Sequence, residues 1–153
     1  MDNIISHLKA DWVSRPRWMN PIFYFCLYMT FVYMPFDLFF KPLASDHEIW
    51  FGIALTGWWA KGTEPLHWAI YTAGAYGFWR MKAWMWPWAA VYLAQVVIAM
   101  FVWNLVNPHG QGVVAGVVAS AVFSVPMIAI WRAKKSFGTD SDTLAESLNP
   151  DPD

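Results

Sequence analysis

The chain has few charged residues. Asp, Glu, Lys and Arg make up 14% of its 153 residues, whereas a soluble domain of average composition carries about 25%. The formal net charge is only −1, so no strong electrostatic attraction to nucleic acid is expected. Hydrophobic residues make up 58% of the chain, and this combination predicts a protein that contacts lipid.

Cysteine and the common catalytic motifs are also scarce. The single cysteine, Cys26, excludes a disulfide bond within the chain. The sequence has no G-x-S-x-G, no H-E-x-x-H, no glycine-rich phosphate loop followed by lysine and no C-x-x-C-H haem motif. These absences favour a non-catalytic protein and leave its cofactors unassigned.

Four apolar segments dominate the rest of the sequence. They cover about residues 21–40, 65–80, 84–106 and 112–131. A helix of about 20 residues crosses the hydrocarbon core, so three of the segments are long enough. The second segment is shorter, and it can span only if long polar side chains at its ends reach the headgroups or if the bilayer is locally thinner. We therefore predict an all-α integral membrane protein with a bundle of four transmembrane helices over residues 20–132.

The two ends of the chain differ from this apolar centre. Residues 1–19 carry Ile4, Ile5, Leu8 and Trp12 at helical spacing without the apolar core of a signal peptide. This pattern predicts an amphipathic helix on the membrane surface. Residues 133–153 are polar and acidic, which predicts a loosely ordered tail.

Basic residues are distributed unevenly around the four predicted spans. If the N-terminus is cytoplasmic, the ten Lys and Arg residues lie on the cytoplasmic side with two exceptions, Lys41 and Lys61. This asymmetry follows the positive-inside rule and predicts that both termini are cytoplasmic. We expect the membrane to be a bacterial cytoplasmic (inner) membrane.

The twelve tryptophans form two bands that agree with this orientation. Indole rings favour the headgroup region, because they combine an apolar body with one N–H donor. The inner band comprises Trp12, Trp18, Trp79, Trp84, Trp86, Trp88 and Trp131, and the outer band comprises Trp50, Trp58, Trp59, Trp68 and Trp103.

The segment between the first two predicted spans is harder to interpret. Residues 49–60 are apolar but too few to span a bilayer, and Pro65 disfavours helix at the residue before it. We interpret residues 46–63 as an outer interfacial or re-entrant helix. The alternative is one broken helix over residues 48–79 with its kink at 62–65.

Most acidic and histidine residues of the predicted bundle fall on the outer side of the membrane in this orientation. Glu64 and His67 have the Glu-x-x-His spacing of carboxylate-bridged metal bundles, but such bundles need two copies and this chain has one. A structural role at a helix start is the simpler interpretation. The metal hypothesis would complete the site with His47 and Glu48, although their spacing matches no closed zinc pattern.

Asp37 is the one acid inside an otherwise apolar run. An acid within a membrane span is a functional candidate by default. Lys41, however, follows at i+4 in the favourable acid-first order, which predicts an ion pair near the headgroups. If the protein is catalytic, the candidate residues are Asp37, Glu64 and His67.

Aromatic and amide side chains near these acids are candidates for ligand contacts. Gln95 lies in the middle of the third predicted span, where it either bonds across helices or touches a ligand. The candidate ligand-binding residues are Trp58, Trp59, Trp68, Gln95, Trp103 and Asn104.

The fourth predicted span carries a row of small residues. Gly112, Gly116, Ser120 and Ser124 follow one another at intervals of four and so share one helical face. Such a groove permits close approach of two helices in lipid. It predicts packing inside the bundle, with a homo- or hetero-oligomer contact as the alternative.

Two functional hypotheses follow from these patterns. The first is a small polytopic membrane protein that is either a non-catalytic subunit of a membrane complex or a bundle that binds a lipid or another small hydrophobic molecule. The second is a membrane-embedded enzyme or metal site on the outer side, which uses Glu64, His67, Asp37 and His47. The second hypothesis requires these side chains to converge.

Overall fold

The computed structural model describes residues 15–138 and is mostly helical. The surface helix predicted for residues 1–19 lies mostly outside the described residues, as does the predicted tail beyond residue 138. Three helices in the described part are long and apolar enough to cross a membrane: Arg17–Phe40, Met85–Val106 and Gly112–Arg132. They correspond to the first, third and fourth predicted spans.

The first long helix is built from several helical segments in succession. A 3-10 turn, Arg17–Met19, leads into α2 (Asn20–Tyr28), a π-helical segment (Met29–Tyr33) and α3 (Met34–Phe40). The wide π turns end two residues before Pro35, which has no N–H to donate and whose ring would crowd the preceding turn. The helix therefore continues past the proline.

A second helix, α4 (Trp58–Trp79), packs along α2 and α3. It corresponds to the second predicted span but begins before residue 65 and contains Pro65 in its interior. The predicted break at Glu64 is therefore wrong. Thr63 donates a hydrogen bond to the carbonyl of Ala60 at 2.8 Å, and the ion pairs of Lys61 and Glu64 described below hold this first part of α4 in place.

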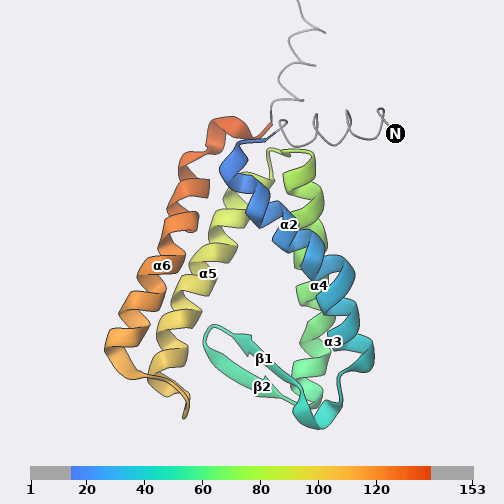
Figure 1. Cartoon of the computed structure of the whole chain (residues 1–153), viewed down its shortest axis with the longest axis vertical. Helices are drawn as coiled ribbons and strands as arrows, with labels where there is room; N and C mark the ends of the chain where they lie inside the picture. The colour runs from blue at the N-terminus through green and yellow to red at the C-terminus, as the bar shows by residue number, and fades with distance from the viewer. Residues whose placement is uncertain (1–14, 139–153) are drawn as a thin grey trace, which may run out of the picture.

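The remaining helices form a second pair. Helix α5 (Met85–Val106) and helix α6 (Gly112–Arg132) pack against each other along their length, and a short 3-10 turn, Lys134–Ser136, follows. In Figure 1 the two pairs converge at the end that carries residues 80–84 and separate toward the opposite end. We call the first end the closed end and the second the hairpin end.

A β-hairpin lies between the two pairs at the hairpin end (Figure 1). Strands β1 (His47–Trp50) and β2 (Ile53–Thr56) are antiparallel, with His47 opposite Thr56 and Trp50 opposite Ile53. The interfacial or re-entrant helix predicted here is wrong, and so is the alternative of a broken helix from residue 48. The fold is thus mostly helical with one two-stranded sheet.

The turn of this hairpin explains why the segment reverses direction. Phe51 and Gly52 both have positive φ, 51° and 85°, as in the tight two-residue turns that match the twist of antiparallel strands. A Cβ on Gly52 would lie 2.6 Å from the backbone nitrogen of Trp103. Glycine therefore serves both the turn and the close approach of the hairpin to α5.

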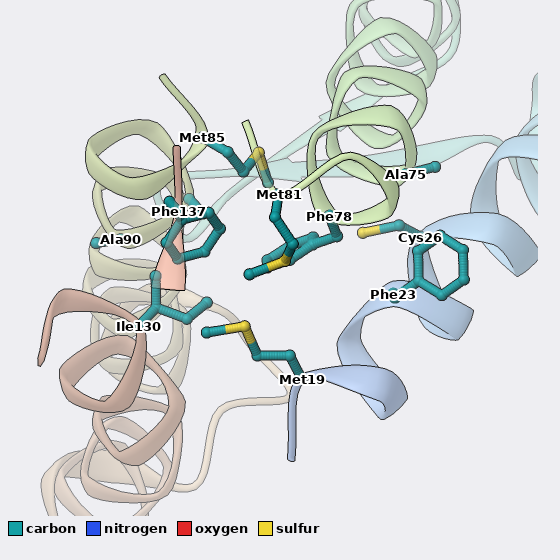
Figure 2. Packing of buried hydrophobic residues seen from close by; sticks show 11 residues of the cluster. Met19, Phe23, Cys26, Ala75, Phe78, Met81, Met85, Ala90, Ile130 and Phe137 are labelled. Carbon is teal, nitrogen blue, oxygen red and sulfur yellow. The ribbon is translucent and has the colours of Figure 1, made fainter. Parts of the chain in front are cut away.

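The apolar core lies at the closed end, where side chains from all the long helices meet (Figure 2). Phe78 from α4 and Ile130 from α6 are almost fully buried, at 2% and 0% exposure. Arg15 anchors the start of the first helix there, because its guanidinium donates to the carbonyl of Phe78 at 3.3 Å and lies 3.9 Å from the ring centre of Phe23. This core holds the two helix pairs together at one end only.

Candidate functional site

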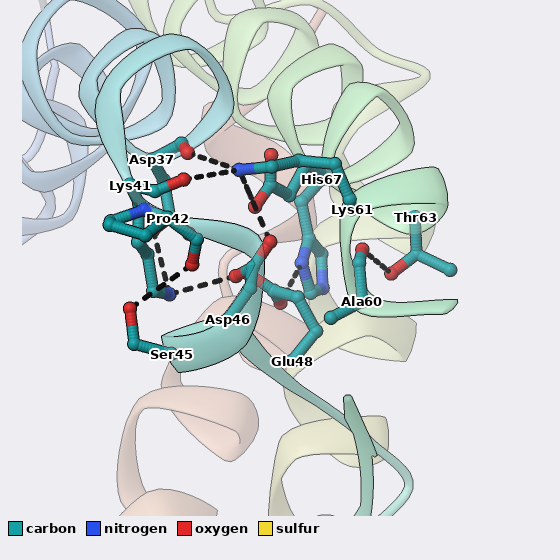
Figure 3. Close-up of polar contacts among 11 residues, drawn as sticks. Asp37, Lys41, Pro42, Ser45, Asp46, Glu48, Ala60, Lys61, Thr63 and His67 are labelled. Atoms are coloured by element: carbon teal, nitrogen blue, oxygen red, sulfur yellow. Dashed lines mark hydrogen bonds and ion pairs between the residues drawn. The ribbon is translucent and has the colours of Figure 1, made fainter. Parts of the chain in front are cut away.

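Charged side chains gather at the hairpin end, where α3 ends, the loop to β1 passes and α4 begins (Figure 3). We call this group the charge cluster: Asp37, Lys41, Asp46, Lys61 and Glu64. The Lys41 ammonium lies 2.7 Å from Asp37 Oδ1 and 3.0 Å from Asp46 Oδ1. The predicted ion pair between Asp37 and Lys41 is therefore confirmed, as part of a larger network.

Lys61 contacts several groups of the charge cluster at once. Its ammonium donates to the backbone carbonyls of Asp37 at 2.6 Å and Lys41 at 3.3 Å. It also lies 3.1 Å from Asp46 Oδ2 and 3.2 Å from Glu64 Oε1. One side chain on α4 thus fixes the end of α3 and the loop before β1.

The carboxylates of the charge cluster are buried. Asp37 is 1% exposed, and Asp46 and Glu64 are both 0% exposed. Burial raises the pKa of Asp46, but the polar contacts of Lys41, Glu64 and Lys61 outweigh it, and the net shift is downward.

A carboxylate–histidine pair adjoins the charge cluster. Glu48 Oε2 on β1 lies 2.7 Å from Nδ1 of His67 on α4. Trp50 stacks on the imidazole with ring centroids 4.1 Å apart and planes inclined by 7°. The pair is held between the hairpin and α4, so that the histidine has a fixed orientation.

Three carboxylates from three separate elements come together beside this pair. Asp37, Glu48 and Glu64 each offer one oxygen, and these oxygens all lie within 4.8 Å of one another. Asp37 Oδ2 and Glu64 Oε2 are buried without a hydrogen-bond partner among residues 15–138. The arrangement is that of a potential cation site.

An apolar cavity of about 470 Å³ lies next to these polar groups, between the first helix and α4 on one side and α5 on the other. Its walls include Phe25, Trp88 and the hairpin residues Trp50 and Phe51. The polar lining groups are mainly at one place: Tyr71 on α4, and Tyr92 and Gln95 on α5. The Tyr92 hydroxyl donates to that of Tyr71 at 3.3 Å.

The structure brings together most of the acids that sequence reasoning selected. Asp37, Glu48, Glu64 and His67 converge as described. His47 is exposed and does not join them, because adjacent residues of a strand point to opposite faces. His67 joins the three carboxylates through Glu48, and none of these side chains lines the apolar cavity, so the second hypothesis stays a prediction.

The predicted ligand contacts are divided between the cavity and other places. Gln95 lines the cavity, whereas Trp58 and Trp59 are 77% and 79% exposed and do not line it. Trp68 donates to the carbonyl of Thr30 at 2.9 Å and so joins α4 to the π-helical segment.

The other two predicted contacts lie near the turn between α5 and α6. Asn104 donates to the carbonyl of Met100 at 2.8 Å and accepts from the backbone of Gln111 at 3.3 Å, which is a structural role. The backbone of Trp103 contacts the hairpin at Gly52.

The row of small residues on α6 faces α5 over part of its length. A Cβ on Gly116 would meet the ring of Phe101 at 3.1 Å, and the Ser120 hydroxyl donates to the carbonyl of Val97 at 3.0 Å. Ser124 bonds within its own helix, to the carbonyl of Ser120 at 2.8 Å, and Gly112 has open space around it. The groove is thus used inside the molecule at its centre.

Sequence reasoning missed three features of this region. The sequence pattern uses Lys61 only for the predicted orientation and Trp50 only for the outer tryptophan band. The tyrosine pair, Tyr71 and Tyr92, was not selected at all. The spacing of Tyr71 from His67, four residues on a helix, was a usable signal because it places both side chains on one face.

The fold and site define a small helical protein with three helices apt for a membrane, a buried cluster of carboxylates and lysines, and an adjacent apolar cavity. No protein-family model, no curated protein and no solved structure matches this chain.

Proposed function

We propose that the chain crosses a membrane four times and binds a small hydrophobic molecule in the cavity between its two helix pairs. The cavity carries this proposal, because it is large enough for a small ligand and is walled almost entirely by apolar and aromatic side chains. Binding pockets for small molecules have this composition, with a few polar groups that fix orientation.

Helix α4 serves as the fourth span in this proposal. Its charged residues, Lys61 and Glu64, lie in its first two turns, and the part after His67 is mostly apolar. The closed end carries the basic segments 15–17, 80–82 and 132–135, which supports a cytoplasmic location for that end. The hairpin end and its charge cluster then lie on the opposite side of a bacterial cytoplasmic membrane.

The cavity also indicates the class of ligand. None of the residues that line it carries a formal charge at neutral pH, so an ionised headgroup inside it would remain without a counter-ion. Tyr92 donates to Tyr71, which leaves the Tyr71 hydroxyl hydrogen free to donate to a ligand, and the Gln95 amide can donate or accept. We therefore expect an uncharged hydrophobic molecule with a carbonyl or hydroxyl group.

A ligand-binding role is favoured over a subunit that docks through the α6 groove. Gly116 and Ser120, at the centre of that groove, already contact α5 of the same chain. These two positions therefore already pack within the chain, and other faces of α6 remain open to a partner helix.

Filling the cavity tests the proposal. Ala73 lines the cavity and has exposed surface there, so Ala73→Phe places a ring in the ligand volume with little strain on the core. We expect the amount of hydrophobic molecule that co-purifies in mild detergent to fall at least tenfold (about 1.4 kcal/mol or more), as measured by native mass spectrometry and solvent extraction.

The matched control is Ala121→Phe, at an exposed alanine of α6 that is not part of the cavity wall. This variant should retain the wild-type amount of bound molecule. Equal retention by both variants, or a wild-type protein that carries no hydrophobic molecule beyond bulk lipid and detergent, would refute the proposal.

A second candidate function is an enzyme that acts on the same ligand. The specific observation in its favour is the pair formed by Glu48 and His67, at 2.7 Å, behind two cavity residues, Trp50 and Tyr71. A histidine oriented by a carboxylate is suited to general acid–base catalysis. His67→Gln keeps a polar side chain of similar reach but cannot exchange a proton at neutral pH.

If the protein is an enzyme, His67→Gln should co-purify with a different molecule from the wild type, because substrate accumulates in place of product. Mass spectrometry of the molecules extracted from the wild type and from His67→Gln distinguishes an enzyme from a binding protein. Ala121→Phe is the control for the effect of a substitution in a folded protein. If both proteins carried the same molecule in the same amount, the enzyme hypothesis would be rejected and the ligand-binding proposal would remain.

A further inference from the structure

We propose that Asp37, Glu48 and Glu64 form a binding site for one divalent metal ion, with His67 positioning Glu48. None of these residues lines the apolar cavity, so the site is separate from the one proposed above and does not depend on it. Its first support is geometric. The three ligand oxygens come from α3, β1 and α4 and lie within 4.8 Å of one another.

That spacing fits a single bound ion. Divalent cations bind carboxylate oxygens at about 2.0–2.6 Å, so two oxygens on opposite sides of one ion are separated by about 4–5 Å. Three oxygens confined within this distance can all contact one ion at the same time. The three elements that supply them meet only here, which makes the arrangement a product of the tertiary fold.

Unpartnered oxygens are the second support. Asp37 Oδ2 and Glu64 Oε2 are buried and accept no hydrogen bond from the described residues, while the other oxygen of each carboxylate faces a lysine. Buried carboxylate oxygens normally have partners, because leaving them without one is costly. A cation at the meeting point of the carboxylates would supply this partner.

The charge balance points the same way. The site and its immediate neighbours contain four carboxylates, Asp37, Asp46, Glu48 and Glu64, and two ammonium groups, Lys41 and Lys61. With all four carboxylates ionised and His67 neutral, four negative and two positive charges leave a surplus of two negative charges. One divalent cation cancels this surplus.

The ligand set also limits the type of ion. Three carboxylates without cysteine favour hard cations such as Mg²⁺, Mn²⁺ or Ca²⁺ over Zn²⁺ or Cu²⁺. His67 is hydrogen-bonded through Nδ1 to Glu48. It therefore orients the Glu48 carboxylate and does not itself contact the ion, as is common for residues just outside a metal site. Mn²⁺ is a suitable probe because its electron paramagnetic resonance signal reports binding directly.

The test is a Mn²⁺ titration of the full-length protein in detergent after treatment with EDTA. We expect about one Mn²⁺ per chain for the wild type and at least a tenfold loss of affinity for Glu64→Gln and for Asp37→Asn, which remove a ligand charge but keep the size of the side chain. The control is His47→Asn, next to Glu48 but exposed, which should bind as the wild type does.

The triple variant Asp37→Asn/Glu48→Gln/Glu64→Gln separates this site from other acidic segments, including residues 140–153. Equal Mn²⁺ binding by the wild type and the triple variant would refute the site, and so would no binding by the wild type.

Thermal unfolding of the wild type keeps the proposal testable if the variants fold poorly. Bound metal raises the Tm with the logarithm of its free concentration, so the Tm in Mn²⁺ should exceed that in EDTA. An identical Tm in both solutions would overturn the proposal.

Discussion

Replacing Lys61 by methionine should destabilise the protein by about 3–5 kcal/mol, the range typical of removing one partner from a buried ionic network. The ammonium of Lys61 is the counter-ion of Asp46 and Glu64, which are both fully buried. It also donates to two backbone carbonyls at the end of α3. Methionine keeps the apolar stem of the side chain and removes only the charge and the donors.

The expected result is a fall in Tm of about 10 °C, measured by intrinsic tryptophan fluorescence in detergent micelles. The matched control is Lys135→Met at an exposed position beyond α6, which should change the Tm by no more than 1–2 °C or so, as exposed surface substitutions usually do. If Lys61→Met and Lys135→Met had the same Tm, the charge cluster would not stabilise this end of the molecule.

Substituting Gly52 by alanine should displace the hairpin from α5. The new Cβ would lie 2.6 Å from the backbone nitrogen of Trp103 and 2.6 Å from Cβ of Val102. Neither group can move without moving α5, so the hairpin must shift. The positive φ of 85° adds backbone strain, and the two effects together should cost about 2–4 kcal/mol.

Gly57→Ala separates the clash from the backbone strain. Gly57 also has a positive φ, 58°, but a Cβ there would meet nothing within 4 Å. Its ψ of −128° places it in a region that nearly only glycine adopts, so Gly57→Ala should cost about 1–3 kcal/mol from backbone strain alone. Hydrogen exchange of the amides in residues 47–56 should increase markedly in Gly52→Ala and only slightly in Gly57→Ala.

The same pair of variants tests the link between hairpin and cavity. Trp50 and Phe51 form part of the cavity wall, so a displaced hairpin should also release the bound hydrophobic molecule. If the two glycine variants retained it equally and had equal stability, the contact between the hairpin and α5 would not shape the cavity.

The three long apolar helices were predictable because length and composition are sufficient evidence for them. Residues 84–106 were predicted and Met85–Val106 is helical, and residues 112–131 agree with Gly112–Arg132. A run of about 20 apolar residues has few alternatives to helix, whatever the rest of the chain does.

The hairpin was not predictable by the same reasoning. An apolar run of about 12 residues fits a short helix or two short strands equally well. The positive φ of Phe51 is unusual for an aromatic residue, and it persists in a turn whose neighbour, Gly52, lies directly against α5. That contact joins residues some 50 positions apart in the sequence, and no local pattern reports it.

The acids of the candidate site were predictable as individual residues but not as a group. Each acid is a candidate because charged residues are rare in this chain. The Glu-x-x-His spacing also places Glu64 and His67 on one helical face. The choice between His47 and Glu48 could not be made, because it depends on which face of a strand is turned inward, and a strand was not expected there.

The sequence by itself determined that this chain has long apolar helices, that its charges are confined to the ends of those helices, and that a few acids depart from this pattern. These properties follow from composition and periodicity, which are local. Only the tertiary structure decided that Asp37, Glu48 and Glu64 meet, that Lys61 joins α4 to α3, and that an apolar cavity opens beside them. Such contacts depend on how helices and hairpin pack across long separations in sequence, and packing is decided by the whole chain.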